Sequence, residues 1–374
     1  MKRLNMPSAL GLLAGALGAC GSVAAPPASV EPGFQTTVVT TFIQPWAMSF
    51  LPDGRALVTL KTGELLLINQ AGETLADVQG VPAVEFGGQG GLGDVVLHPD
   101  FAENRQLYLS YAEAGSGKTR GAAVARATLT ETETGAELSE LKVIWRQSPK
   151  VTGRGHFGHR LAFSEDGYLY ISSGDRQKFD PAQDLKQSLG KVLRLNADGS
   201  VPDDNPFSAQ AGVAAEVWSY GHRNPLGLAF DSEGQLWNTE MGPRHGDELN
   251  RVVRGANYGY PIVSNGDHYS GKDIPDHSTR PEFVPPAAYW VPAISPGSLM
   301  IYSGDLFPEY KGNAFIGGLS SQALVRVALS GSTAKEVERF AMGNRIREVE
   351  QGPNGAIWLL EDGGNGRLLK LTPR

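Results

Sequence analysis

A histidine in a glycine-rich turn and an aspartate one strand further on are the residues of this chain best suited to proton transfer. His156 lies in the turn 153–158, whose sequence is Gly-Arg-Gly-His-Phe-Gly. Small neighbours leave room for a ligand to approach its ring closely. Asp175 follows the strand-like run 169–173, so a β-hairpin would return it to the ring. A histidine held by a carboxylate acts as a general base, and the pattern therefore predicts removal of a proton from a substrate.

Three arginines have the chemistry to hold negative charge. Arg223 precedes Asn224 and Pro225, and the proline favours an extended Asn224, so Arg223 projects from a rigid turn. Such an arginine can stabilise a developing oxyanion. Arg345 and Arg347 are two residues apart; on a strand they point the same way and form a site for carboxylates or phosphates. For each arginine the alternative is a solvated side chain, and the spacing leaves it open.

The loop 240–250 is acidic and contains Gly242 and Pro243. Hard cations such as Ca²⁺ take oxygen ligands, including the backbone carbonyls that these two residues can present. The pattern alone indicates little, because acidic loops are usually only solvated. Five histidines have neither cysteine partners nor the i,i+4 spacing of a helical zinc site: His98, His222, His245, His268 and His277.

The elements that position these residues are predicted to be β-hairpins. A hydrophobic residue, a polar turn that usually contains glycine and a short strand recur in six segments: 50–58, 98–109, 163–170, 230–237, 311–316 and 352–358. Such turns between strand-like runs are hairpin signals. Six copies predict a six-bladed β-propeller with mostly four-stranded antiparallel blades over residues 36–374. The alternative is a pair of β-sandwiches whose turns recur by coincidence.

Composition agrees with an all-β protein and limits the partners. The 374 residues include 47 glycines and 24 prolines, which favours short strands and tight turns. The net charge is −7. Such an acidic protein is not expected to bind nucleic acid, and any anionic ligand must be held by a local group of arginines.

The first residues resemble a bacterial lipoprotein export signal. Lys2 and Arg3 precede a short apolar stretch, and small residues lead to Cys20, the single cysteine. We expect a signal peptide over 1–19, lipidation of Cys20 and a flexible tether over 20–35. Because Gly21 is not the aspartate that retains lipoproteins in the inner membrane, we expect an outer-membrane anchor facing the periplasm. An ordinary secretory signal with a chance cysteine is the alternative.

Several motifs occur in a fixed order along the chain: Gly88-Gln89-Gly90-Gly91-Leu92, Leu97-His98-Pro99-Asp100-Phe101, Gly155-His156-Phe157-Gly158, Gly174-Asp175, Gly221-His222-Arg223-Asn224-Pro225, Gly242-Pro243 with Asp247-Glu248, and Asn344-Arg345 with Arg347. In this order they resemble the soluble aldose sugar dehydrogenases that depend on pyrroloquinoline quinone (PQQ). The resemblance runs from about residue 36 to the C-terminus. It implies a six-bladed propeller with the quinone at one end of its central channel.

The resemblance also implies roles for the candidate residues. His156 would take the proton of the sugar's anomeric hydroxyl while hydride passes to PQQ, which gives a lactone. Asp175 would orient His156, and Arg223 would stabilise charge on the quinone oxygen.

In the same resemblance, Gln89 and Asn224 would contact the polar edge of the cofactor, as Arg223 would, and Arg345 and Arg347 would meet the quinone and its carboxylates. The carbonyls of Gly242 and Pro243 would hold Ca²⁺. No electron acceptor is indicated.

Two departures from the family pattern concern the cofactor shell. Ser320 stands where the family usually has a lysine that meets a cofactor carboxylate, and Met241 stands where a polar residue such as glutamine is common. Both changes predict weaker cofactor binding. Tyr289, Trp290 and the stretch 291–297 are candidates for contacts with the sugar.

Two other functions stay open. One is a metal-dependent propeller lactonase or other hydrolase, although the several side-chain ligands that such a site needs are not clearly marked. The other is a non-catalytic binding lipoprotein of the envelope, which the two departures favour.

Overall fold

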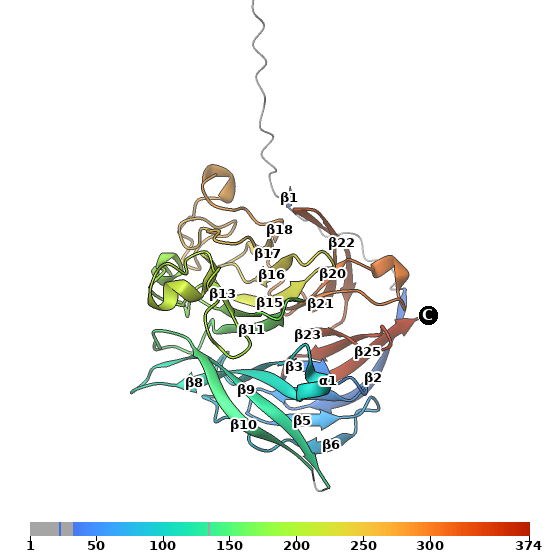
Figure 1. The fold of residues 1–374 in the computed structure, drawn as a ribbon. Helices are drawn as coiled ribbons and strands as arrows, with labels where there is room; N and C mark the ends of the chain where they lie inside the picture. Colours follow the sequence, from blue (N-terminus) through green and yellow to red (C-terminus); the bar gives the residue numbers. More distant parts are fainter. Residues whose placement is uncertain (1–21, 24–32, 134) are drawn as a thin grey trace, which may run out of the picture.

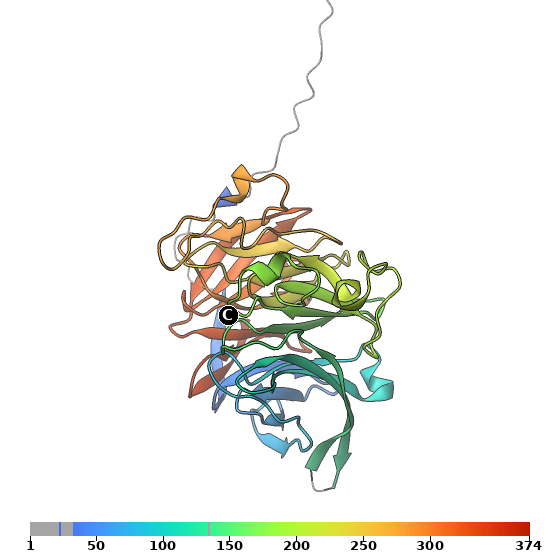
Figure 2. The ribbon, with the colours of Figure 1, turned by 90° about the vertical axis from the view of Figure 1, so that its left-hand side faces the viewer.

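The computed structural model describes residues 22–23, 33–133 and 135–374, and these fold into a six-bladed β-propeller. The predicted fold is confirmed, because each blade is an antiparallel sheet of four strands. The four strands are consecutive in five blades, and in the sixth a strand from the beginning of the chain completes the sheet. The predicted signal peptide, most of the tether and Cys20 lie outside the described residues, so they stay predictions. Figure 1 and Figure 2 show that the β9–β10 hairpin projects beyond the rest of its blade.

Five blades are built from strands in simple succession along the chain. Blade one contains β3 (Pro45–Phe50), β4 (Ala56–Leu60), β5 (Leu65–Ile68) and β6 (Thr74–Asp77). Blade two contains β7 (Leu92–Leu97), β8 (Gln106–Ala114), β9 (Arg120–Thr132) and β10 (Gly135–Arg146), and blade three contains β11 (Gly158–Phe163), β12 (Leu169–Ser173), β13 (Lys191–Leu195) and β14 (Val217–Tyr220). Blade four contains β15 (Pro225–Phe230), β16 (Leu236–Glu240), β17 (Asp247–Arg251) and β18 (Ala288–Trp290), and blade five contains β19 (Pro296–Ile301), β20 (Ala314–Gly318), β21 (Ala323–Ser330) and β22 (Thr333–Ala341).

Blade six joins the two ends of the described chain. β23 (Ile346–Gln351), β24 (Ile357–Glu361) and β25 (Gly366–Pro373) are completed by β2 (Phe34–Phe42), which pairs antiparallel with β25. Figure 1 shows β2 beside β25 near the C-terminus. This pairing joins the two ends of the described chain in one blade and so closes the ring, in which only short, protected strand edges remain. The short strand β1 (Ser22–Val23), within the predicted tether, pairs in parallel with β18.

The first strand of each blade lies at the centre of the ring, where it contacts the first strands of the neighbouring blades. All six show a register shift near their start, as a β-bulge produces: between Pro45 and Ala47, Leu92 and Val95, Gly158 and Leu161, Pro225 and Gly227, Pro296 and Ser298, and Ile346 and Glu348. Because a bulge re-aims side chains, consecutive residues at these positions can both face the channel.

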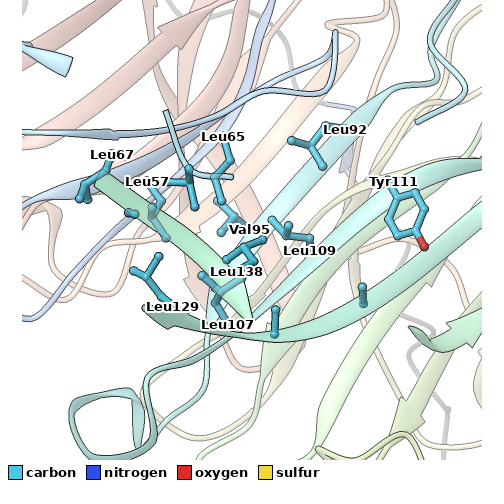
Figure 3. Packing of buried hydrophobic residues seen from close by; sticks show 14 of the residues in the cluster. Leu57, Leu65, Leu67, Leu92, Val95, Leu107, Leu109, Tyr111, Leu129 and Leu138 are labelled. Carbon is cyan, nitrogen blue, oxygen red and sulfur yellow. The ribbon is translucent and has the colours of Figure 1, made fainter. Parts of the chain in front are cut away.

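Apolar side chains between adjacent blades form the core. Figure 3 shows Leu57 and Leu65 of blade one packed with Val95 and Leu109 of blade two. Alternate residues of a strand face one side of a sheet, and burial of each such side chain contributes roughly 1.5–3 kcal/mol. The blades are thereby fixed against one another, and the loops at their ends are held in place.

Helices are few and short. They are α1 (Phe101–Asn104) and the 3₁₀ turns η1 (Asp180–Gln183), η2 (Gly212–Glu216), η3 (His277–Thr279) and η4 (Pro308–Tyr310). No helix within the described residues has the length and apolarity needed to cross a bilayer.

Candidate active site

The predicted site residues gather at one end of the propeller because of where they lie in each blade. Gln89, His156, Arg223 and Arg345 come just before the first strand of blades two, three, four and six. The first and second strands of a blade are antiparallel, so residues that follow a second strand reach the same end. Asp175 follows β12 in this way. Six loops of similar position therefore converge on one face.

A cavity of about 210 Å³ opens at this end of the channel, and we call it the site cavity. Of the predicted residues, Gln89, Arg345 and Arg347 line it, as does Met241. Phe157 and Gly158, directly after His156, also line it. The remaining lining residues include Trp46, Lys61, His159, Leu226, Leu319 and Asp362. His156, Asp175, Arg223 and Asn224 are not among the lining residues. His156, Arg223 and Asn224 are hydrogen-bonded to lining residues, namely Gln89, the Met241 carbonyl and the Gly158 N–H, and Asp175 contacts His156.

His156 and Asp175 form a close, buried pair. His156 Nδ1 lies 2.6 Å from Asp175 Oδ1, and the two residues are 5 % and 0 % exposed. Asp175 is held in turn by the backbone N–H groups of Gln177 and Phe179, which donate to its carboxylate over 3.0 and 3.3 Å. With Nδ1 donating to the carboxylate, the lone pair of His156 lies on Nε2. Nε2 has no hydrogen-bond partner among the described residues.

The backbone of His156 is held in an unusual conformation. Its φ is +51°, a region that non-glycine residues rarely adopt and that is found at functional sites. Its N–H donates to Gln89 Oε1 over 2.6 Å, so Gln89 fixes the turn as well as lining the cavity. Gly174 leaves space for this turn, since a Cβ there would lie 2.2 Å from the His156 carbonyl oxygen.

The protonation state of His156 suits a base. Burial lowers the pKa of the imidazole, and nearby Arg223 lowers it further, whereas Asp175 raises it; the net direction is downward. The ring is therefore neutral at pH 7 and able to accept a proton.

Arg223 and Asn224 have buried donors that no described residue uses. Arg223 Nη1 donates to the Met241 carbonyl over 2.9 Å, but its Nε has no partner. The side-chain oxygen of Asn224 accepts from the Gly158 N–H over 3.2 Å, while its Nδ2 has no partner. Buried donors are nearly always paired, so these two groups indicate a missing acceptor.

Arg345 and Arg347 meet on one carboxylate, as their spacing predicts. Arg345 Nε donates to Asp362 Oδ2 over 2.8 Å, and Arg347 Nε and Nη2 donate to Oδ1 over 3.0 and 2.9 Å. Burial would raise the pKa of Asp362, but the guanidinium of Arg347, followed by that of Arg345, holds it below its ordinary value. Two cations therefore share one anion at the cavity wall.

The loop with Gly242 and Pro243 is braced by Asp247. Asp247 Oδ1 accepts from the Gly242 N–H over 2.9 Å, and Oδ2 accepts from the N–H groups of Ile294 and Ser295. Burial raises the pKa of Asp247 to about 6. Within the described residues, no hydrogen bond uses the carbonyl oxygens of Gly242 and Pro243. Among the same residues, no three His, Cys, Asp or Glu side chains are grouped as metal ligands.

One expectation from the sequence is corrected, that for Trp290. Trp290 does not contact the cavity: it is 1 % exposed and donates its ring N–H to Glu336. Ser320 does not line the cavity either, since its hydroxyl donates to the Ala293 carbonyl over 3.2 Å. Its neighbour Leu319 takes the cavity position.

Sequence reasoning missed four lining residues: Trp46, Lys61, His159 and Asp362. Their positions carry a signal. Lys61 and Asp362 directly follow the second strands of blades one and six, as Met241 and Leu319 do in blades four and five. Trp46 and His159 are the second residues of inner strands. Aligning the predicted hairpins by these two positions would have found all four.

These features define a β-propeller that holds a buried histidine–aspartate pair next to a cationic cavity at one end of its channel. Residues 42–370 match the Glucose / Sorbosone dehydrogenase family, and the chain belongs to that family.

The chain is also similar to individual proteins and solved structures. The chain is 41 % identical over 339 residues to the aldose sugar dehydrogenase YliI of Escherichia coli, covering 88 % of this chain and 90 % of that protein. The crystal structure of the soluble E. coli aldose sugar dehydrogenase in its apo-form superposes with a TM-score of 0.86, at 39 % identity and 91 % and 100 % coverage of this chain and that one. The PQQ-bound aldose sugar dehydrogenase of Streptomyces coelicolor gives 0.75, at 29 % identity and 94 % and 100 % coverage.

Proposed function

We propose that this protein is a PQQ-dependent dehydrogenase that oxidises aldose sugars at the anomeric carbon to lactones. The observation that carries the proposal is the buried pair of His156 and Asp175, in which His156 directly precedes Phe157 and Gly158, which line the same cavity as Arg345 and Arg347. The family, and the PQQ-bound relative from Streptomyces, support the same cofactor.

The residues around the cavity fit PQQ. The cofactor carries three carboxylates and two quinone oxygens, all of which accept hydrogen bonds. Arg223 Nε and Asn224 Nδ2 are buried donors without an acceptor among the described residues, and Arg345 and Arg347 share a single carboxylate. Gln89 also lines the cavity. When bound, PQQ supplies a two-electron acceptor for the hydride that leaves the sugar carbon.

The residues of the chain then supply the proton chemistry. Nε2 of His156 accepts the proton of the anomeric hydroxyl, so the sugar loses one proton and one hydride and becomes a lactone. Asp175 keeps the ring oriented through Nδ1 and stabilises the positive charge that it gains. Arg223 stabilises negative charge that develops on the acceptor side of the site.

For the metal, we propose that the carbonyl oxygens of Gly242 and Pro243 bind Ca²⁺. Hard cations accept such ligands, and no hydrogen bond within the described residues occupies these oxygens. Asp247 supports the proposal indirectly, because it fixes the Gly242 N–H and thereby the loop.

Reconstitution tests the proposal. The purified protein, given PQQ and Ca²⁺, is expected to reduce a dye with glucose and with other aldoses, and His156→Ala is expected to lower kcat by about 10²- to 10⁴-fold. His98→Ala is the control, because His98 follows strand β7 at the opposite end of the propeller. Absence of activity with every aldose would contradict the proposal, and lactone hydrolysis with a metal alone would favour the hydrolase instead.

A further inference from the structure

We propose that Lys61, on blade one, binds a carboxylate of the cofactor and completes the anion-binding wall of the site. This inference rests on the proposed function for the identity of its ligand. The anionic character of the ligand follows from the wall itself. Lys61 lies directly after β4 and lines the site cavity together with Arg345, Arg347 and Asp362.

Two hydrogen bonds fix the backbone of Lys61, and one holds its ammonium. Its backbone N–H donates to the Gln44 carbonyl over 2.9 Å, and its carbonyl accepts from Leu92 over 3.1 Å. Its Nζ donates to the Gly88 carbonyl over 2.8 Å. An ammonium has three donors, and this is its one hydrogen bond to a described residue. The other two donors are therefore available to a ligand in the cavity.

The wall carries more positive than negative charge. Lys61, Arg345 and Arg347 are three cations, and Asp362, which both arginines contact, is the carboxylate among the described residues lining the site cavity. Burial lowers the pKa of Lys61, and Arg347 lowers it further. Burial also lowers the pKa of Arg347. Like charges so placed repel one another, and a ligand with two carboxylates would relieve this repulsion.

The position on blade five where a lysine was expected offers no substitute. Ser320 is neutral and exposed, and its hydroxyl is bonded to the Ala293 carbonyl. Leu319, which does line the cavity on that side, is apolar. Blade one thus provides the ammonium that blade five lacks, and the cation reaches the cavity from the side of Gly88 and Gln89.

Direct binding measurements on the full chain test the role of Lys61. PQQ in the presence of Ca²⁺ is titrated against tryptophan fluorescence, without any sugar or turnover. Lys61→Met keeps the apolar stem but removes the charge, and we expect its Kd to rise about 10- to 100-fold, the usual effect of one lost charged hydrogen bond. Lys61→Gln, which retains an N–H donor, is expected to lose nearly as much, whereas Lys61→Arg is expected to stay near the wild type.

Lys311→Met is the matched control, because Lys311 is an exposed lysine paired with Asp305 on the surface. Its Kd is expected to remain that of the wild type. The unfolding midpoint of each variant shows whether it is folded. The proposal is overturned if the charge-free variants, Lys61→Met or Lys61→Gln, bind PQQ as tightly as the wild type does.

A redox-inert probe separates this inference from the proposed function. Benzene-1,3,5-tricarboxylate carries three carboxylates but no quinone. If the wild type binds this probe in a Lys61-dependent way but does not bind PQQ, the cofactor assignment fails and the anion site stands. If it binds PQQ with no dependence on Lys61, the cofactor assignment stands and the inference fails. If it binds neither compound, both are wrong.

Discussion

Two cavities along the central channel differ in the charges that line them. The site cavity is lined by Lys61, Arg345 and Arg347. A second cavity of about 100 Å³, further along the inner strands, is called here the channel cavity; its charged lining residues are Asp94, Glu348, Glu350 and Arg160. In β23, Arg347 lines the site cavity and the next residue, Glu348, lines the channel cavity. The bulge at the start of each inner strand makes this possible.

Arg160 lines the channel cavity, and its guanidinium is engaged by other groups of the protein. Its Nε donates to the Leu226 carbonyl over 2.9 Å and its Nη2 to the Gly297 carbonyl over 2.6 Å. It forms ion pairs with Asp94 and Glu348, and its guanidinium lies 4.0 Å from the ring centre of Trp46.

Arg223 differs from Arg160, because its buried Nε has no partner among the described residues. The comparison teaches that an arginine satisfied on every side supports the scaffold, whereas one with a spare buried donor is available for a ligand.

The substitution Arg160→Met tests the scaffold role of Arg160 and has the largest expected effect. It leaves Asp94 and Glu348 buried without their cation, and removal of one partner of a buried pair costs about 3–5 kcal/mol of folding free energy. Urea unfolding at pH 8 measures the loss. At pH 5 we expect a smaller loss, because the carboxylates can then take up protons. Arg280→Met, in an exposed pair with Glu282, is expected to cost less than about 1 kcal/mol. An equally small loss for Arg160→Met would show that Arg160 does not stabilise the scaffold.

The fold followed from local sequence signals. Turns with Asp-Gly, Glu-Gly or Asn-Gly, as at 53–54 and 354–355, need only their own residues and the strands beside them. Four of the six recurring segments contain such a dipeptide, at 53–54, 166–167, 233–234 and 354–355, and the six segments together were enough to predict six blades. The proximity of His156 to Asp175 is local in the same sense, because β11 and β12 form one hairpin in which Gly158 pairs with Ser173.

Contacts between blades could not be read from the sequence. Arg160 and Arg347 both lie within the first three residues of an inner strand. Their roles differ only because their side chains meet different partners, which are distant in the sequence. The carbonyl of Gly297, which Arg160 contacts, is 137 residues away. Trp290 was misjudged for a related reason. Its strand β18 is separated from β17 by a long loop and not by a hairpin turn. The direction in which the Trp290 side chain points could therefore not be inferred from a repeated pattern.

The substitution Glu348→Gln tests the character of the channel cavity through the pH dependence of the free energy of unfolding. Burial raises the pKa of Glu348 from 4.5 to about 8, although Arg160 opposes the shift. Between these values the folded chain holds a proton that the unfolded chain releases, so the free energy of unfolding falls as pH rises from about 5 to 8. We expect a fall on the order of 2–3 kcal/mol in the wild type and a clearly flatter profile in the variant.

Urea unfolding at several pH values measures this profile. Some slope is expected to remain in Glu348→Gln, because burial also raises the pKa of Asp94 and of Glu350. Glu103→Gln, at an exposed position of α1, should keep the slope of the wild type. Identical slopes in Glu348→Gln and the wild type would mean that Glu348 does not hold this proton.

Gly93→Ala tests the packing against His159, which lines the site cavity, and has the smallest expected effect. A Cβ at Gly93 would lie 2.0 Å from Cε1 of His159, whose ring stacks on Trp46 at 4.9 Å and is bonded to Ser110 Oγ. Overpacking costs about 1–3 kcal/mol. We expect the lower half of that range, since His159 borders the site cavity and has space to move into it. Gly364→Ala, where a Cβ meets nothing within 4 Å, is the control in urea unfolding. A stability of Gly93→Ala equal to that of the control would mean that His159 is not tightly packed against Gly93.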